Sequence, residues 1–239
     1  MLPILKSPIY TLTLPSTGKP IQYGAFLVRD EKILALAIQD GTPKVITETL
    51  KQIIKNCTFG QVKVDDLASF DIEYLFLNLR SKSKGNMVEL RYTCKNVVDG
   101  VVCDKTNPFS IDLDAITVDM KNAPDMKIML DKTVGLMMKY PNLDSILEVQ
   151  LALAKGDLSV IYDNMSQFVE CVFEGKEVDT TFTPQQFSAW LETLSAAQFK
   201  KIENFFINIP SVVSKTSVCC SKCQHKEDIV INGLHSFLA

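Results

Sequence analysis

The chain of 239 residues is 46% hydrophobic and carries a formal net charge of −3. This content suffices for one substantial core or two lobes and excludes a disordered chain. No apolar run approaches the roughly 18 residues of a membrane span, the first residues do not resemble a secretion signal, and basic residues do not cluster with aromatic ones as on a nucleic-acid-binding surface. We therefore expect a protein that is not exported and that binds neither membranes nor nucleic acids.

The N-terminal residues predict a pair of antiparallel strands. Apolar and polar side chains alternate over residues 9–14, and a turn at 15–18 separates them from a second extended stretch at 21–28. The next apolar run, residues 33–38, is compatible with a helix or with a buried strand, and we favour the helix.

Two longer helices are expected next. Residues 43–57 repeat apolar side chains at intervals of three and four, with Thr42 in the cap position and Pro43 in the first helical position. Residues 65–82 are apolar around most of a helical wheel, which predicts a helix buried on several sides. Its charged side chains need partners or a path to solvent, because an unpaired buried charge is too costly. These side chains are Asp71, Glu73 and Arg80.

The centre of the chain is rich in expected strands, and the part after Pro141 is rich in expected helices. Alternating patterns predict strands at 87–94, 101–103, 109–113, 116–120, 127–130 and 134–139. From Pro141 to Pro210 the period becomes helical, with helices at 144–154 and 158–173 and behind two capping boxes, Thr183 to Gln186 and Ser195 to Gln198. Beyond Pro210 the chain turns extended again.

Four of the seven cysteines form two groups that predict a shared metal site. Cys220 and Cys223 have the two-residue spacing with which one tight turn holds two thiolates on a tetrahedral ion. Cys94 and Cys103 flank the sequence Val-Val-Asp-Gly-Val-Val, which is typical of a two-residue β-hairpin. In such a hairpin Cys103 faces Asn96, and Cys94 lies two residues from Asn96 on the same face, so both sulfurs point the same way. As diagonal neighbours they need a strongly twisted ribbon to reach one ion.

The other candidate ligands have simpler interpretations. Cys57 and Cys171 fall within helical patterns and are expected in the core, whereas Cys219 should face away from the metal-binding pair. An odd number of cysteines in a long chain fits a disulfide framework poorly. A redox-active C-x-x-C remains an alternative, and His225 could replace one sulfur as a ligand, although we rank it below Cys94.

These patterns predict an α+β fold: a β-rich module with a four-cysteine, zinc-ribbon-like site, interrupted by a helical insertion. The chain is expected to have three parts. Residues 1–140 hold the β-rich core and the helices at 43–57 and 65–82. Residues 141–210 form the helical insertion, and residues 211–239 return to the module and the metal site. Four thiolates in a structural role favour zinc. An iron–sulfur cluster is the alternative, because it too takes four cysteines.

Sequence signatures of catalysis were not found. The chain lacks a nucleophile elbow, a phosphate-binding glycine loop, a zinc-protease helix and a dinucleotide fingerprint. Its two histidines, His225 and His235, lie close together near the C-terminus. A site closed by four cysteines also leaves no position for the water or substrate that catalytic zinc requires. We therefore expect a non-enzyme.

Three stretches carry a resemblance: residues 26–34, residues 70–77 with 80–85, and the segment from Cys220 to Cys223 with 231–234 and 236–237. They are similar to the baseplate hub and hub-assembly proteins of T4-like contractile-tailed bacteriophages. The resemblance spans most of the chain and is weakest from about Pro141 to Pro210. Many members carry two C-x-x-C knuckles, whereas here eight residues separate Cys94 from Cys103.

The resemblance implies a viral protein without activity on small molecules, which acts in the host cytoplasm during assembly or is built into the virion tail baseplate. Its partners would be phage baseplate hub and tail proteins, and it could also form a homo-oligomer. The competing interpretation is a cellular zinc-ribbon module that recognises nucleic acid or a transcription partner. The acidic Glu227 and Asp228 beside Lys222 and Lys226 do not favour it. A third interpretation, a thiol oxidoreductase, requires a depressed thiolate pKa in the C-x-x-C pair.

Overall fold

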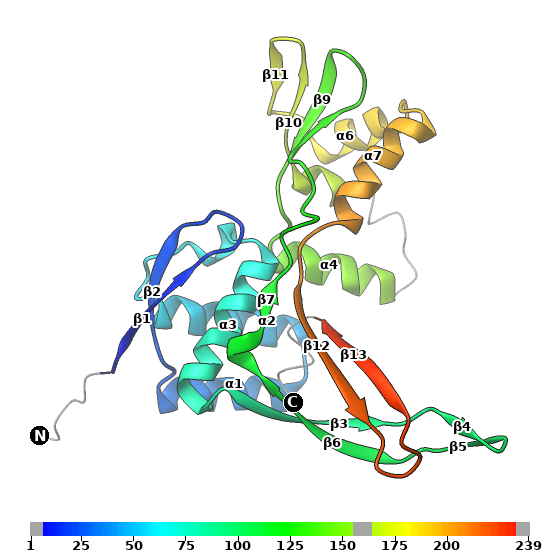
Figure 1. The fold of residues 1–239 in the computed structure, drawn as a ribbon. Coiled ribbons are helices and arrows are strands. Elements are labelled where there is room, and N and C mark those ends of the chain that lie inside the picture. Colours follow the sequence, from blue (N-terminus) through cyan, green and yellow to red (C-terminus); the bar gives the residue numbers. More distant parts are fainter. Residues whose placement is uncertain (1–6, 155–163, 233–239) are drawn as a thin grey trace, which may run out of the picture.

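The computed structural model describes residues 7–154 and 164–232 (Figure 1). Helices and strands are mixed along the chain, which confirms the expected α+β fold. None of the helices in these residues is both long enough and apolar enough to cross a membrane.

The N-terminal hairpin has the expected antiparallel pairing. β1 (Ile9–Thr13) faces β2 (Pro20–Gly24), with Leu12 opposite Ile21 in the core. The second strand is shorter than predicted, because α1 (Val28–Asp40) begins where the strand was expected to end. The preferred helical interpretation of residues 33–38 is confirmed, since they lie within α1.

Helices α2 (Pro43–Cys57) and α3 (Ser69–Lys84) form the centre of the lower body in Figure 1. Thr42 and Pro43 occupy the predicted cap and first helical positions of α2. The long helix expected from residue 65 begins only at Ser69, after a short 3-10 turn, η1 (Val64–Asp66). Its burial on several sides is confirmed: one face packs against β1, β2 and α2, and the opposite face packs against the strands of the cysteine region.

Burial shifts the pKa values of two charged side chains of α3, Asp71 and Arg80. Asp71 is fully buried, and its carboxylate accepts hydrogen bonds from the backbone N–H (3.0 Å) and the hydroxyl of Ser16. Burial nevertheless raises the pKa of Asp71, against the opposing effect of these hydrogen bonds. Burial likewise lowers the pKa of Arg80.

A long hairpin projects from the end of α3 toward the cysteines. Its outer pair is β3 (Met87–Thr93) with β6 (Thr106–Asp112), and its tip is β4 (Val97–Val98) with β5 (Val101–Val102). The register stays constant from one end to the other, with Met87 opposite Asp112 and Val98 opposite Val101. The strand expected at 109–113 is therefore longer, since it begins at Thr106 and ends at Asp112.

A second hairpin crosses the first one. β12 (Val212–Cys219) pairs with β13 (Lys226–Asn232), and β7 (Thr117–Val118) adds two residues to the far edge of β12 after the 3-10 turn η2 (Leu113–Ala115). β7 is shorter than the strand expected at 116–120. Figure 1 shows the two hairpins meeting at the lower right, away from the helices.

The upper lobe in Figure 1 is built on a four-stranded antiparallel sheet of order β11-β10-β9-β8. The strands are β8 (Lys127–Met129), β9 (Val134–Met138), β10 (Val169–Glu174) and β11 (Glu177–Asp179). This sheet packs on helices α6 (Pro184–Leu191) and α7 (Ala196–Ile207) through one apolar cluster. Both predicted capping boxes are confirmed at the starts of these helices, and the aromatic side chains of both helices belong to the core.

The helix predicted at 158–173 is wrong over its described part. After α4 (Leu143–Ala154), which was predicted correctly from residue 144, residues 155–163 lie outside the described part of the chain. The segment then forms a 3-10 turn, η3 (Met165–Phe168), and strand β10. Valine and phenylalanine residues followed by a glycine turn favour a hairpin, and β9 offers β10 a pairing edge. The proposed division at residues 140 and 210 stays a prediction.

Candidate metal centre

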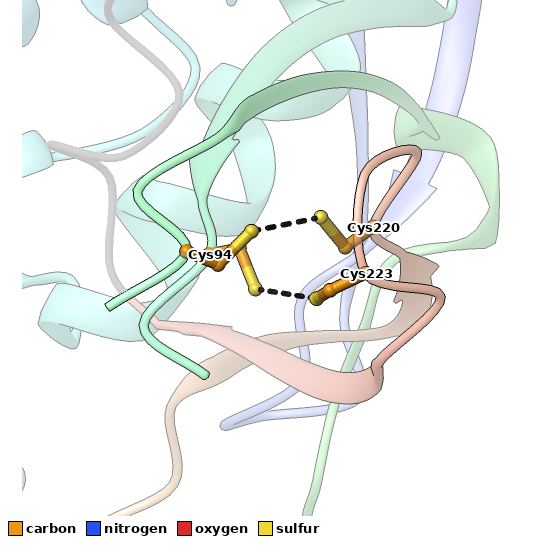
Figure 2. Close-up of side chains that lie close together, drawn as sticks. Cys94, Cys220 and Cys223 are labelled. Atoms are coloured by element: carbon orange, nitrogen blue, oxygen red, sulfur yellow. Dashed lines mark hydrogen bonds between the residues drawn. The ribbon is translucent and has the colours of Figure 1, made fainter. Parts of the chain in front are cut away.

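Four cysteine side chains converge where the two hairpins cross. Their Sγ atoms all lie within 4.8 Å of one another. Cys94 Sγ is 3.7 Å from Cys223 Sγ, and Cys103 Sγ is 3.8 Å from Cys220 Sγ. Figure 2 shows Cys94 on one side and Cys220 and Cys223 on the other, with their sulfurs turned toward one another. A disulfide needs about 2.05 Å between its sulfurs, so these are four separate thiols.

The first pair is held by a sharp reversal of the backbone within the long hairpin. The N–H of Cys94 donates to the carbonyl of Lys105 at 2.9 Å, and the N–H of Asp104 donates back to the carbonyl of Cys94 at 3.0 Å. Asp104 adopts a left-handed conformation with a φ of 52°. Cys103 faces Asn96 as predicted, since its N–H donates to the Asn96 carbonyl at 2.8 Å.

The second pair sits in the turn between β12 and β13. The N–H of Cys220 donates to the carbonyl of His225 at 2.8 Å, and the N–H of Gln224 donates to the carbonyl of Cys220 at 3.0 Å. Gln224 has a φ of 55°. Each hydrogen bond and the left-handed residue therefore have a counterpart in the first pair. The matching positions are Cys94 and Cys220, Cys103 and Cys223, Asp104 and Gln224, and Lys105 and His225.

Both cysteine pairs thus lie in the same tight backbone turn, called a knuckle below, although their spacings differ. From the spacing of the first pair we expected that a strong twist of the ribbon would be needed. In the structure, the left-handed residue after the second cysteine reverses the backbone instead, and the two sulfurs are brought together by the same turn in both pairs.

Asparagine side chains support the knuckles. Asn107 is only 3% exposed, and its Oδ1 accepts hydrogen bonds from the N–H and the hydroxyl of Ser221, both at 2.9 Å. Its Nδ2 donates to the carbonyl of Lys105 at 3.0 Å, so one side chain joins the two knuckles. Asn96 Nδ2 lies 3.7 Å from Cys223 Sγ and donates toward it. Neither asparagine was predicted from the sequence, because no spacing rule marks residues that act across 114 and 127 positions.

A family model described as a T4 bacteriophage base plate protein matches residues 7–239, which is nearly the whole chain. The chain belongs to this family. No curated protein and no solved structure matches it. As a member of the T4 base plate family, it is a component of a bacteriophage base plate, and it interacts there with other base plate proteins.

The thiols of this base plate protein differ in their readiness to ionise. The backbone N–H of Cys223, followed by that of Lys222 and the side chain of Asn107, lowers the pKa of Cys220 to about 6 against the effect of burial. The N–H of His225 and the Asn96 side chain lower the pKa of Cys223. A thiolate is the form that binds metal. The lowered pKa values of Cys220 and Cys223 therefore favour the form that could bind a cation.

The first knuckle shows the opposite tendency. The N–H of Asn96 lowers the pKa of Cys94, but burial and the neighbouring thiols of Cys223 and Cys220 outweigh it and raise the value to about 11. Crowded thiols resist ionising together, because each thiolate disfavours the next. A cation held by Cys94, Cys103, Cys220 and Cys223 would offset this repulsion and favour the thiolate form of each.

The depressed pKa of Cys220 meets one requirement of the oxidoreductase interpretation, but the surroundings of the sulfur do not. Cys220 is fully buried, and its sulfur faces the thiol of Cys103 rather than solvent. A thiol that attacks a substrate disulfide must be accessible. The geometry of this base plate protein therefore favours a closed cation site over a redox pair.

The remaining candidates lie outside the cluster. Cys57 is buried in the core of the lower body, as predicted, and burial raises its pKa to about 12. Cys219 is exposed, as expected for a residue that faces away from the pair. Cys171 is only partly buried and lies in β10 rather than in a helix. His225 contributes its backbone carbonyl to the second knuckle, and its side chain is not part of the four-thiol group.

The spacing of the four sulfurs fits a single ion. A tetrahedral zinc ion with Zn–S bonds of about 2.3 Å holds its thiolates about 3.8 Å apart. Two of the sulfur pairs in this base plate protein lie at 3.7 and 3.8 Å, and all four sulfurs lie within 4.8 Å of one another. The four thiols are therefore close enough together to bind one metal ion.

Proposed function

We propose that this base plate protein is a non-enzymatic structural or assembly protein of the baseplate hub of a contractile-tailed phage. The observation that carries the proposal is the family match over residues 7–239. Its partners would be hub and tail proteins, which it meets in the host cytoplasm during assembly. It would act through protein–protein interfaces, and a structural metal site would fix the geometry of one of these surfaces.

We further propose that Cys94, Cys103, Cys220 and Cys223 hold one zinc ion. Four thiolates with no open position suit a structural zinc site. The sulfur separations support one ion over an iron–sulfur cluster, since a cluster places several iron and sulfide atoms between its thiolates. The buried donors and their supporting asparagines provide the second layer of hydrogen bonds that metal ligands commonly have.

The role of such an ion would be to join the crossed hairpins. Tyr92 is a partly buried side chain that packs against the cluster, and its hydroxyl donates to the Glu227 carboxylate on β13. The apolar cluster that the two hairpins share lies closer to α3, and few apolar side chains surround the four sulfurs themselves in the described part of the chain. A metal ion can replace a hydrophobic core in such a small module, because its binding energy becomes folding energy.

Elemental analysis of the anaerobically purified chain tests the metal proposal. We expect one zinc ion per chain and no iron, with loss of zinc in the single variants Cys94→Ser and Cys220→Ser. Cys219→Ser is the matched control, because Cys219 is exposed and outside the group. Full zinc content in both first-named variants would overturn the proposed site.

Complementation tests the biological role. A phage whose copy of this gene is interrupted is supplied with the variants from a plasmid, and the assembled base plates are counted by electron microscopy. We expect assembly with Cys219→Ser and failure with Cys94→Ser and Cys220→Ser. Strong, salt-sensitive binding of the purified chain to single-stranded or duplex DNA would instead favour the nucleic-acid interpretation.

A further inference from the structure

The two knuckles of this protein differ by one inserted element. Two residues separate Cys220 from Cys223, whereas eight separate Cys94 from Cys103. Two backbone hydrogen bonds and the left-handed residue correspond in the two knuckles. The extra six residues are 97–102, which form β4, β5 and their turn. The first knuckle is therefore an ordinary C-x-x-C turn with a hairpin inserted into it.

The inserted hairpin is apolar on both faces. Val97 faces Val102 and Val98 faces Val101, so each pair occupies one face of the ribbon. The four side chains are 59%, 48%, 45% and 69% exposed, in that order. Figure 1 shows β4 and β5 extending beyond the point where the two longer hairpins cross.

Neither local structure nor the metal site accounts for these valines. Two paired strands of this length are marginal by themselves, and the turn already has the favoured Asp-Gly sequence, with φ values of 52° and 79°. Polar β-branched residues such as threonine would form the same hairpin without exposing apolar surface to water. The valines are explained if they are covered in the assembled base plate.

We propose that residues 97–102 are a docking hairpin whose valines enter an apolar slot in another base plate protein, with a Lys or Arg side chain at the far end of the slot. The inference rests on the proposed function, since it takes the base plate as the place where the hairpin is covered. A slot is required rather than a flat surface, because the two valine pairs point in opposite directions.

The charged residues of the hairpin indicate which charge the partner should carry at the far end of the slot. Lys95 and Asp104 form an ion pair of 3.4 Å at the base and compensate each other. Asp99, at the apex, is the only other charged residue between them in the sequence. The leading end of the hairpin therefore carries one negative charge, which a cation in the slot would match.

A second copy of this chain fits poorly as the occupant. Two hairpins packed on each other would each cover only one valine pair of the other, and the apex of each would bring Asp99 rather than a cation. A lipid surface fits poorly as well, because Asp99 would enter it first and the hairpin has no Trp or Tyr to lie at the membrane interface.

Deletion of residues 97–102 separates docking from metal binding. The deletion joins Asn96 to Cys103 and leaves the sequence Cys-Lys-Asn-Cys, which has the spacing of the second knuckle. Facing residues of an antiparallel ladder lie about 4.5–5.5 Å apart and a trans peptide spans 3.8 Å, so the join needs only a small movement. We expect full zinc content in this variant, but a loss of base plate assembly of at least about 100-fold in complementation.

Two milder variants keep the hairpin itself. Val97→Thr with Val102→Thr preserves shape and strand preference but makes one face polar, and we expect crosslinking from position 98 to the partner to fall at least about tenfold. Asp99→Asn preserves the turn, because Asn-Gly suits the same left-handed positions. This substitution removes only the charge, and the yield of crosslinks from position 98 to the partner should fall about two- to tenfold.

Photocrosslinking identifies the occupant. A benzoylphenylalanine is placed at Val98 in the full chain produced during infection, and the crosslinked peptides are sequenced by mass spectrometry. The same group at Lys44, an exposed residue of α2, is the control. We expect crosslinks from position 98 to apolar residues of one other base plate protein, and none to that protein from position 44.

Crosslinks from position 98 to a second copy of this chain or to lipid would overturn the inference. Normal complementation by the deletion variant would overturn it too. The proposed function would survive that last result if Cys94→Ser and Cys220→Ser still failed to assemble base plates. It would fail together with the inference only if the cysteine variants also complemented.

Discussion

Asn107 and Ser221 are 114 residues apart, and two hydrogen bonds of 2.9 Å join the Asn107 side-chain oxygen to the N–H and hydroxyl of Ser221. The same asparagine donates to the carbonyl of Lys105, which is the acceptor that positions Cys94. One buried amide therefore sets both knuckles in a fixed relation. Because it is almost fully buried, water cannot replace its partners.

Asn107→Ala should destabilise the protein and weaken metal binding together. The substitution leaves the Ser221 N–H without its acceptor, which costs about 1–3 kcal/mol of unfolding free energy. Loss of such a supporting hydrogen bond typically lowers metal affinity about 10–100-fold. Urea unfolding and competition with a zinc chelator measure the two effects. Ser221→Ala removes only the hydroxyl and should cost about 0.5–1.5 kcal/mol; equal effects of both variants would contradict the assigned role of Asn107.

Metal removal should expose a defined set of thiols to alkylation. In the metal-loaded protein we expect iodoacetamide to modify the exposed Cys219 first and the four clustered cysteines hardly at all. After treatment with a chelator, the four should become reactive, because few apolar side chains pack around the sulfurs to keep them buried. Peptide mapping by mass spectrometry gives the modified positions. Cys57 serves as an internal control, since it stays buried in the core of the lower body. Identical labelling with and without chelator would exclude a metal at this site.

Asp71→Asn should stabilise the protein more at neutral pH than at acidic pH. Burial raises the pKa of Asp71 above its ordinary 3.8, so the folded protein holds this proton more tightly than the unfolded chain does. The resulting stability is fully present below the unfolded pKa and is lost as the pH rises through the folded pKa. The asparagine variant has no such loss, and its amide can still bond to Ser16.

Urea unfolding at pH 7 and pH 4 checks this prediction. The advantage of Asp71→Asn over the original chain should be larger at pH 7. Both proteins share the cysteine cluster, whose own response to pH cancels in the comparison. A larger advantage at pH 4 would show that the carboxylate is favoured in the folded protein, contrary to the raised pKa of Asp71.

Gly135→Ala should destabilise the upper lobe. A Cβ at position 135 would lie 2.6 Å from the carbonyl oxygen of Ile128 and 2.4 Å from the Phe173 ring. The ring could turn aside, but the carbonyl belongs to the neighbouring strand β8 and cannot move without disturbing the sheet. We expect a loss of about 1–3 kcal/mol, as for other overpacked sites. Thermal unfolding measures it, with Gly175→Asn as a comparison at an open turn with φ of 59°, which asparagine tolerates. An unchanged stability in Gly135→Ala would show that the sheet yields at this point.

Local patterns determined much of the fold. The alternation in β1 and β2, the apolar spacing of α2 and the capping boxes at Thr183 and Ser195 each act within a few residues, and the structure has them as predicted. The segment ending at Phe173 was misjudged because a short apolar run suits either a helix or a strand, and its partner β9 lies about thirty positions earlier in the chain.

The sequence by itself determined which thiols were candidates and how the hairpin at Asp99 turns, because both depend on spacing over a few residues. Only the tertiary structure decided that the four sulfurs meet, that Asp104 and Gln224 give both pairs the same turn, and that Asn107 joins them. The physical reason is that these groups come within bonding distance only in one relative orientation of the two hairpins. That orientation depends on the packing of both hairpins on α3, which lies far from the cysteines in the sequence, as well as on Asn107.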